Sequence, residues 1–147
     1  MTTIRNARTY DAPVLADLCG ELGYPTTRQQ VVRRLAVIEG LADCGVLVAE
    51  DDEGRVVGWL HVTLVAQLCN DACAEITGLV IAQSARGRGI GQCLVSAAEK
   101  WGCARGLPSI RVRSRVERER AHQFYERMGY ARIKTQAVFS KPLAQGS

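Results

Sequence analysis

The sequence has no run of about 18 apolar residues, the length that a membrane-spanning helix needs. Its longest apolar stretch, residues 56–68, is interrupted by glycine, histidine, threonine and glutamine. The residues that follow Met1 lack the apolar core of a secretory signal peptide. These absences predict a cytoplasmic protein that is neither secreted nor inserted into a membrane.

Cysteine pairs of the kind that bind metals are also missing. The six cysteines stand at positions 19, 44, 69, 73, 93 and 103 without a C-x-x-C pair, and the two histidines, His61 and His122, lie far from any cysteine cluster. Zinc sites usually need such close spacing. A chain of 147 residues buries about two thirds of its unfolded surface and needs no disulfides for stability. We therefore expect no bound metal, and reduced thiols that are mostly buried.

No internal repeat, low-complexity tract or Pro/Gly-rich linker divides the chain. Domains typically hold about 100–200 residues, so residues 1–147 are expected to form a single domain. Hydrophobic residues make up 47% of the chain and charged residues 23%. That composition is typical of a globular protein rather than a disordered or collagen-like one.

Charge is distributed unevenly along the chain. The formal net charge is +4, but residues 1–85 carry −5, from 6 basic and 11 acidic side chains, whereas residues 86–147 carry +9, from 13 basic and 4 acidic ones. An acidic half joined to a basic half indicates a protein that meets a cation on one side and an anion on the other. Chance surface patterning explains the charges alone equally well.

Four helices are predicted from apolar residues that recur at intervals of three and four. Asp11, as a capping residue, and Pro13 open the first helix. A capping box of Thr27 and Gln30 opens the second. The other two helices are expected at residues 90–103 and 121–128.

Short apolar or alternating stretches, bounded by turn residues, predict the strands. The strands are expected at residues 2–8, 45–50, 55–66, 74–81 and 109–114, with one or two closing strands within residues 131–141. The resulting order, β-α-α-β-β-β-α-β-α-β-β, predicts an α/β fold in which a mixed sheet carries helices on both faces.

A glycine-rich loop, residues 82–92, lies between a predicted strand and a predicted helix. Glycines let a backbone approach a ligand closely, and the first turn of a helix offers free N–H groups and a positive dipole end, which suit an anion. Arg86 and Arg88 add two guanidinium groups for phosphate oxygens. The loop lacks the pattern of a Walker A or a dinucleotide-binding motif, and a plain turn has no need of the arginines. It therefore indicates a phosphate-bearing ligand of another kind.

Two short motifs resemble the signatures of one enzyme family. The pattern R-x-x-G-x-G at residues 86–91 is similar to the first signature of the GNAT superfamily of N-acetyltransferases, and A-x-x-F-Y-x-x-x-G-Y at residues 121–130 is similar to its second. Both stand in the family's order and separation, and the predicted element order is also the family's. The resemblance implies a GNAT-type, mostly antiparallel sheet and an enzyme that moves an acetyl group from acetyl-CoA to a primary amine.

The resemblance also implies which residues hold acetyl-CoA. Backbone N–H groups of the loop are expected to bind its pyrophosphate, and the preceding strand is expected to pair with its pantetheine arm while the N–H of Leu79 polarises the thioester carbonyl. Gly78 suits a bulge or a close backbone approach, although a simple strand glycine is nearly as good an explanation. The expected binding residues are Leu79, Val80, Ile81, Arg86, Gly87, Arg88, Gly89, Ile90, Gly91 and Gln92.

Tyr125 stands where the family carries its general acid, which protonates the leaving thiolate. Periodicity alone allows a second interpretation, in which Tyr125 belongs to an apolar stripe with Phe124 and Met128. Many members of the family have an asparagine seven residues before the tyrosine, whereas this chain has Arg118. That arginine either contacts a cofactor phosphate or lies on the plain surface.

Glu75 matches a strand position at which some members of the family carry the general base that takes the amine's proton. Four extended residues separate it from Leu79 by about 13 Å, so we expect a bridging water rather than direct contact with the amine. A solvated glutamate at the start of a strand is an equal alternative. Glu117 and Glu119 are further candidates for the base.

The acceptor is expected to be cationic. The acidic half supplies the first two helices and a hairpin, which border the acceptor cleft in the resembled family, and carboxylates there raise the local concentration of cations. A small polyamine, an amino sugar or a protein N-terminus fits this expectation. Trp59 and His61 share one face of a strand that can border the same cleft. For His61, a core side chain satisfied by a backbone group is the simpler interpretation.

The sequence is also compatible with two other classes of function. A catalytically silent acyl-CoA-binding module has the same fold and loop. A nucleic-acid binder is suggested by the arginines at positions 111, 113, 115, 118 and 120, but the chain lacks interleaved aromatic residues and any known binding motif. We therefore expect neither nucleic acid nor a membrane as a partner. Exposed closing strands are edges at which two copies can pair, which predicts a homodimer.

Overall fold

The structure, a computed structural model, describes residues 2–144. Two compact units divide the chain, Met1–Arg113 and Ser114–Ser147. The expected single domain over residues 1–147 stays a prediction.

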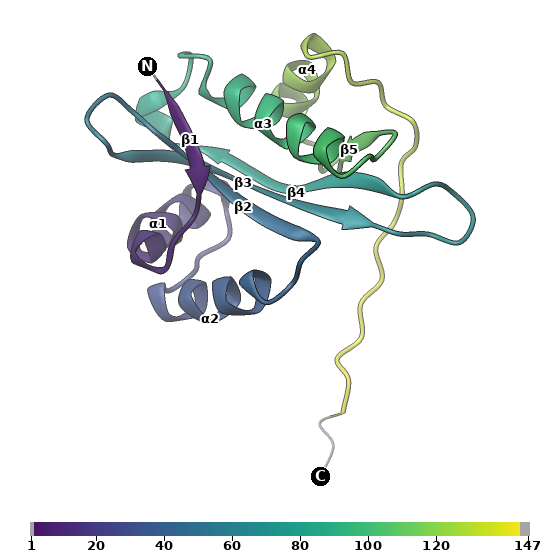
Figure 1. Cartoon of the computed structure of the whole chain (residues 1–147), viewed down its shortest axis with the longest axis horizontal. Coiled ribbons are helices and arrows are strands. Elements are labelled where there is room, and N and C mark those ends of the chain that lie inside the picture. Colours follow the sequence, from purple (N-terminus) through teal and green to yellow (C-terminus); the bar gives the residue numbers. More distant parts are fainter. Residues whose placement is uncertain (1, 145–147) are drawn as a thin grey trace. The chain divides into compact units, whose positions relative to one another are not determined.

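The first unit contains five strands and three α-helices among its described residues (Figure 1). In chain order they are β1 Thr3–Asn6, α1 Ala12–Leu22, α2 Arg28–Glu39, β2 Cys44–Glu50, β3 Val56–Val65, β4 Cys73–Ile81, α3 Ile90–Ala104 and β5 Ile110–Val112. Two short 3₁₀ turns, η1 Thr9–Asp11 and η2 Gln83–Ala85, precede α1 and α3. The second unit contains one helix in its described part, α4 Glu119–Arg127.

The five strands form one sheet in the order β1-β2-β3-β4-β5. Neighbouring strands from β1 to β4 are antiparallel, and β5 pairs with β4 in parallel. Helices α1 and α2 lie on one side of this sheet and α3 lies on the other (Figure 1). The predicted mixed, mostly antiparallel sheet with helices on both faces is therefore confirmed.

The closing strands predicted within residues 131–141 are wrong. Residues 130–144 contain neither helix nor strand, and the apolar side chains of Ile133, Val138 and Phe139 are 77%, 82% and 93% exposed. Alternation in this segment is weak, and a strand forms only where a neighbouring strand accepts and donates its backbone hydrogen bonds. A local pattern carries no information about such a neighbour.

The helix starts follow the predicted signals in part. Thr27 Oγ1 accepts a hydrogen bond from the Gln30 N–H at 3.1 Å, and Gln30 Oε1 accepts one from the Thr27 N–H at 3.0 Å, so the capping box is confirmed. Asp11 precedes α1 as predicted, but its side chain makes no cap hydrogen bond to that helix. Its carboxylate is bound instead by the side chain of Arg5 and the N–H of Arg8.

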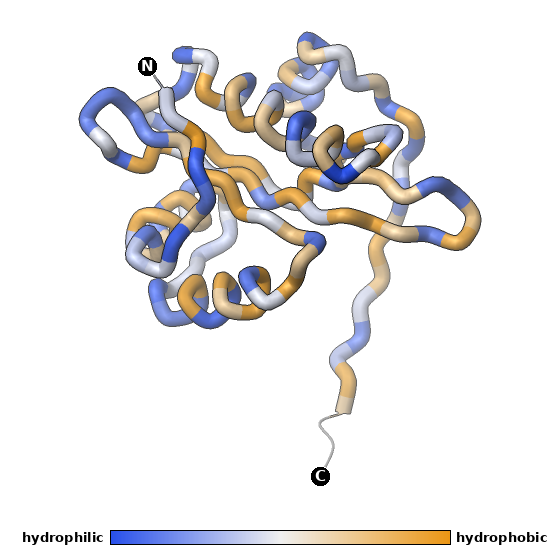
Figure 2. The backbone as a smooth tube through the Cα atoms, viewed as in Figure 1, coloured by the Kyte–Doolittle hydropathy of each residue, from blue (hydrophilic) through white to orange (hydrophobic). Residues whose placement is uncertain are grey.

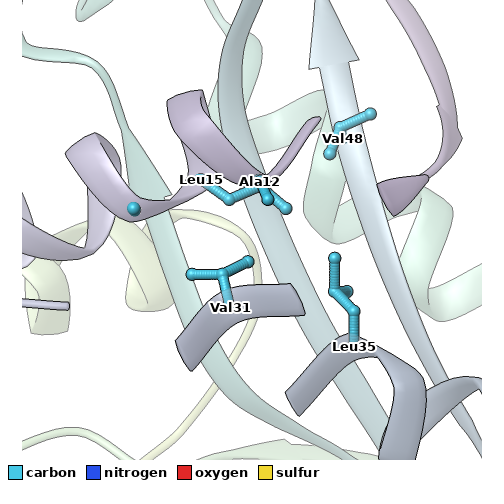
Figure 3. Close-up of a cluster of buried hydrophobic side chains, with 6 residues drawn as sticks. Ala12, Leu15, Val31, Leu35 and Val48 are labelled. Carbon is cyan, nitrogen blue, oxygen red and sulfur yellow. The ribbon is translucent and has the colours of Figure 1, made fainter. Parts of the chain in front are cut away.

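Apolar side chains fill both sides of the sheet. On one side, α1 and α2 pack onto β2 through a buried cluster (Figure 3), whose members are Ala12, Leu15, Ala16, Val31, Leu35 and Val48. On the other, Leu94, Val95 and Ala98 of α3 are fully buried. The turn between β2 and β3 is strongly hydrophilic (Figure 2), because it consists mainly of acidic residues. Removing this apolar surface from water is the main source of stability of the first unit.

The thiols are free, as expected, but most of them are not buried. Cys73 is buried, Cys19 and Cys44 are half-buried, and the cysteines at positions 69, 93 and 103 are exposed. The expectation of mostly buried thiols was wrong. Three of the cysteines lie on the surface of α3 or in the loop after β3, and residue type alone does not tell which side of a helix a cysteine occupies.

A buried ion pair connects β1, β2 and the start of α1. Arg5 donates from Nη1 and Nη2 to the two carboxylate oxygens of Asp11 at 2.8 and 2.9 Å, and its Nε lies 3.3 Å from Glu50 Oε1. Asp11 is only 4% exposed. Burial raises its pKa, but the hydrogen bonds from Arg5 and the Arg8 N–H outweigh that effect, so the pKa lies below the usual range.

Replacing Asp11 by Asn is expected to lower the free energy of unfolding at pH 7 by about 2 kcal/mol, because it weakens the charge-assisted hydrogen bonds from Arg5 while Glu50 remains as a second partner. Since the pKa of Asp11 is lowered by folding, its contribution is complete above about pH 4 and is lost as the pH falls through the folded value. The difference between the wild type and D11N should therefore shrink in acid. Urea unfolding at several pH values measures it.

Asp17→Asn is the matched control, since Asp17 lies exposed on the same helix. It should change stability by less than about 0.5 kcal/mol. Equal stability of D11N and D17N would contradict a structural role for the ion pair.

Candidate functional site

β4 and β5 pair over only part of their length. Ala74–Ile76 of β4 pairs with Ile110–Val112 of β5, whereas β4 continues to Ile81. Within the described part of the chain, residues 77–81 therefore have no strand partner on the β5 side. Unpaired N–H and C=O groups along such an edge can bind another extended chain as an added strand.

A β-bulge lies where this free edge begins. His61 pairs with Gly78 and Val62 pairs with Ile76, so Thr77 is an extra residue on β4. The hydroxyl of Thr77 donates to the carbonyl of His61 at 3.4 Å. The sequence-based expectation that Gly78 belongs to a bulge is confirmed.

The bulge reverses the direction of the backbone groups that follow it. Before it, the Ala74 N–H donates to Ser109 O beside β5, at 3.0 Å; after β4, the Ala82 N–H donates to Val57 O of β3, at 2.7 Å. N–H groups alternate between the two edges of a strand, so those of Leu79 and Ile81 are directed away from β3. The predicted oxyanion donor, the Leu79 N–H, thus points to the free edge.

The glycine-rich loop follows this edge directly. Gly87 and Gly89 have φ angles of +82° and +77°, a conformation that favours glycine, and a Cβ built on either meets nothing within 4 Å. Helix α3 makes its first hydrogen bond from the Cys93 N–H to Gly89 O. The N–H groups of residues 90–92 therefore precede the helical hydrogen bonds and are oriented as an anion site requires.

Two side chains frame the loop. Glu21 of α1 accepts a hydrogen bond from the Gln83 N–H at 2.8 Å, which fixes the start of the loop against that helix. Arg86 donates from Nε to Ile81 O, the last carbonyl of β4, at 3.4 Å. Arg86 and Arg88 are both exposed, so their guanidinium groups are accessible to phosphate oxygens.

These parts fit acetyl-CoA. A free strand edge suits the extended amide-bearing arm, and open glycines, helical N–H groups and two arginines suit the pyrophosphate. All ten of the predicted binding residues lie on the second half of β4, in the loop or in the first turn of α3. Their contact with the co-substrate stays a prediction.

Glu75, the predicted base, is engaged in a structural contact. Its Oε1 accepts hydrogen bonds from the Nε atoms of Arg111 and Arg113 at 2.7 and 3.0 Å, and the residue is only 8% exposed. The ion pairs join β4 to β5 and to the residue after it. Both hydrogen bonds use the same carboxylate oxygen, and the predicted role of Glu75 as the base is untested.

Tyr125 lies on α4 of the second unit, between two aromatic rings. The ring centroids of Phe124 and Tyr130 are 5.2 and 5.9 Å from its own. Burial raises the pKa of Tyr125 to about 12, against a small opposite effect of the Arg118 charge. The phenol therefore keeps its proton at neutral pH, which is the form that a general acid needs.

Trp59 and His61 have an unexpected feature. Trp59 Nε1 and His61 Nε2 are buried and lack hydrogen-bond partners. The simpler interpretation, in which a backbone group satisfies His61, does not hold for this nitrogen. Sequence reasoning placed both residues on one face but gave no signal that their polar atoms lack partners.

Residues 2–144 offer neither a membrane span nor a cluster of metal ligands. No helix there combines the length and the hydropathy that a bilayer span requires. No group of three or more His, Cys, Asp or Glu side chains is arranged to hold a metal ion in that part of the chain.

Comparisons with known proteins agree with the geometry. The sequence matches the acetyltransferase (GNAT) family model over residues 15–130. It is 26% identical over 145 residues to an aminoglycoside N(6')-acetyltransferase type 1 of Stenotrophomonas maltophilia, which covers 96% of this chain and 94% of the relative. It is 30% identical over 105 residues to a mycothiol acetyltransferase of Renibacterium salmoninarum, and there the match covers 70% of this chain but only 31% of the relative.

A solved structure of an aminoglycoside N-acetyltransferase in complex with CoA has the same fold, with a TM-score of 0.84 at 16% identity, and the match covers 97% of this chain and 96% of that one. The family match includes both signature motifs and most of the chain. The chain therefore belongs to the GNAT family of N-acetyltransferases, as its two motifs predict.

Proposed function

We propose that this protein transfers the acetyl group of acetyl-CoA to a primary amine of a small cationic acceptor, and that an amino sugar is the best candidate. The observation that carries the proposal is the free second half of β4, which leads directly into an open glycine-rich loop at a helix N-terminus. The two features together suit an extended arm that ends in a pyrophosphate. Six free cysteines fit a cytoplasmic location.

The co-substrate supplies an activated thioester when bound, and the chain's own residues position it. In the proposal, the backbone of Leu79 and Ile81 pairs with the arm, and the Leu79 N–H donates to the carbonyl oxygen on which negative charge develops. The N–H groups of residues 90–92, with Arg86 and Arg88, neutralise the pyrophosphate.

Tyr125 is proposed as the general acid. Its raised pKa, about 12, keeps the hydroxyl protonated at neutral pH, so it can donate a proton to a thiolate as the C–S bond breaks. A phenol with that pKa also recovers its proton readily from water.

Two observations support a cationic amino sugar as the acceptor. Residues 1–85, which include α1, α2 and the hairpin of β2 and β3, carry a net charge of −5. The relative from Stenotrophomonas maltophilia, which aligns over nearly the whole chain, is an aminoglycoside acetyltransferase. Polyamines and protein N-termini are the other candidates. A homodimer is untested, and the closing strands from which it was expected do not form within residues 130–144.

A thiol-release assay with acetyl-CoA and a panel of amines tests the function. The panel contains aminoglycosides, simple amino sugars, polyamines and a peptide with a free N-terminus, and mass spectrometry confirms the acetylated product. Binding of acetyl-CoA without turnover of any amine would favour the alternative, a silent acyl-CoA-binding module.

Gly89→Val is expected to abolish acetyl-CoA binding measured by calorimetry. Gly89 has a φ angle of +77° with open space around it, so a β-branched side chain both strains the loop and occupies the space of the phosphate. Gly20→Ala is the control, because Gly20 lies in α1 with open space and an ordinary φ angle. Unchanged affinity in folded G89V would remove the loop from the site.

Tyr125→Phe keeps the ring and deletes only the hydroxyl. We expect kcat to fall by about 100-fold or more, the lower bound for loss of a general acid, with little change in Tm. Phe124→Tyr is a useful control, because it alters the neighbouring ring of the same cluster. If kcat of Y125F is unaltered while chemistry limits the wild-type rate, Tyr125 is a packing residue.

Salt is expected to lower kcat/KM for a polycationic acceptor and to leave that for a neutral amine nearly unchanged. Attraction between separated charges is screened over about 10 Å at 0.1 M salt. Initial rates between about 20 and 300 mM salt, which span the relevant screening lengths, measure the effect. An anionic best acceptor, or no salt dependence for a polycation, would contradict steering by the acidic half.

A further inference from the structure

Three side chains in the described part of the chain carry a buried polar atom without a hydrogen-bond partner. One is Ser114, at the start of the second unit. The other two, Trp59 Nε1 and His61 Nε2, lie two residues apart on β3 and therefore on the same face of the sheet. Leaving a buried donor or acceptor unpaired is unfavourable, and such groups call for a partner.

Both side chains lie beside the bulge of β4. His61 is directly opposite Gly78, and directly paired positions have Cβ atoms about 4.5–5.5 Å apart. A Cβ on Gly78 would lie 2.8 Å from Cη2 and Cζ3 of Trp59, so the indole ring occupies the place of a side chain at that position. The imidazole and the indole thus border the peptide between Gly78 and Leu79.

This position is close to the expected chemistry. The N–H of Leu79, which points to the free edge of β4, is the proposed donor to the thioester carbonyl. His61 lies one residue from it across the sheet, whereas Glu75 lies beyond the bulge and is bound by two arginines. In register, the His61 imidazole is thus closer to that N–H than any carboxylate of β3 or β4.

The charge state of His61 also suits a proton acceptor. Burial lowers its pKa, and no charged group contributes to the shift. Across the sheet, the titratable or charged side chains of the same face are Arg5, Cys44, Glu50, Glu75 and Arg111. The helices that pack on this face meet it with apolar side chains. The imidazole is therefore neutral at pH 7.

We propose that His61 is the general base of the acetyl transfer and that its Nε2 takes the proton which the acceptor amine loses. Trp59 Nε1 donates to an oxygen of the same acceptor, such as the hydroxyl beside the amine of an amino sugar. The inference rests on the proposed function, and it assigns the base to β3 instead of Glu75.

The proposed transfer forms one bond and breaks another. The amine's lone pair forms the N–C bond to the thioester carbonyl carbon, and the C–S bond breaks with its electron pair on sulfur. The proton from nitrogen goes to Nε2 of His61 and then to water. The thiolate takes a proton from Tyr125, which recovers one from water. The products are an amide and a free thiol, with no oxidant or reductant involved.

Kinetics of His61→Gln provide the first test, with an acceptor amine whose pKa lies well above 7. We expect kcat/KM at pH 7 to fall by about 100-fold or more. In the wild type, the logarithm of kcat/KM should rise with a slope of about two below the pKa of His61 and about one above it, because base and amine must both be neutral. In H61Q the slope should be about one throughout.

Two variants separate chemistry from folding. His61→Ala should regain activity when imidazole is added to the buffer, which a packing defect would not do. Thr63→Val is the matched control: Thr63 lies on the same face of β3 and bonds to Cys44 Sγ at 3.1 Å, so its loss tests a general disturbance of the sheet. T63V should keep the wild-type pH profile.

NMR gives a measurement that is independent of turnover. The chain has only two histidines, and both ring nitrogens of His122 already have partners, Arg115 O at 2.8 Å and Arg132 Nη2 at 3.0 Å. Without acetyl-CoA, addition of the acceptor should shift the ring signals of His61 and leave those of His122 unchanged.

The outcomes distinguish the two proposals. If the wild type acetylates no amine, the proposed function fails. If the wild type is active but H61Q keeps its rate and its pH profile, His61 is not the base while the function stands. Loss of activity in H61A without rescue by imidazole, together with an unshifted His61 signal, would also overturn the assignment.

Discussion

A single extra residue in β4 determines which way the backbone groups of the second half of that strand point. If Thr77 were paired regularly with His61, the N–H groups of Leu79 and Ile81 would point to β3 and would form hydrogen bonds within the sheet. With the bulge, they face the side on which β5 has already ended. The proposed pairing of the acetyl-CoA arm, the proposed oxyanion donor at Leu79 and the proposed base at His61 all depend on this reversal.

Three contacts stabilise the bulge. The Thr77 hydroxyl bonds to the carbonyl of His61, the indole of Trp59 covers Gly78, and Glu75 joins β4 to two arginines at the point where the strands begin to separate. Glu75, whose predicted role as the base is untested, thus holds the paired part of β4 and β5 together. The site is rigid because its backbone belongs to the central sheet, whose apolar faces are covered by α1, α2 and α3.

Most of the fold was predictable because its signals are local. Capping at Thr27, the acidic turn after β2 and the glycines of the loop act within a few residues, and the structure has helices and strands where they predict them. The arginine partners of Glu75 lie 36 and 38 residues away, and a local sequence pattern does not predict contacts at that separation. The closing strands were predicted wrongly for the same reason, because an alternating pattern indicates which side chains share a face but not whether a neighbouring strand is present. The lack of hydrogen-bond partners at the ring nitrogens of Trp59 and His61 also depends on tertiary packing, which the sequence pattern does not describe.

The hydrogen bond from Arg86 to the last carbonyl of β4 means that the ligand-free edge is not bare. The guanidinium supplies the hydrogen bond that a neighbouring strand would otherwise donate to this carbonyl. If acetyl-CoA binds as proposed, an arm that forms its own bond to Ile81 O would displace the guanidinium and release it toward the pyrophosphate. Arg86 would then connect the binding of the arm at the strand edge to the binding of the pyrophosphate in the loop.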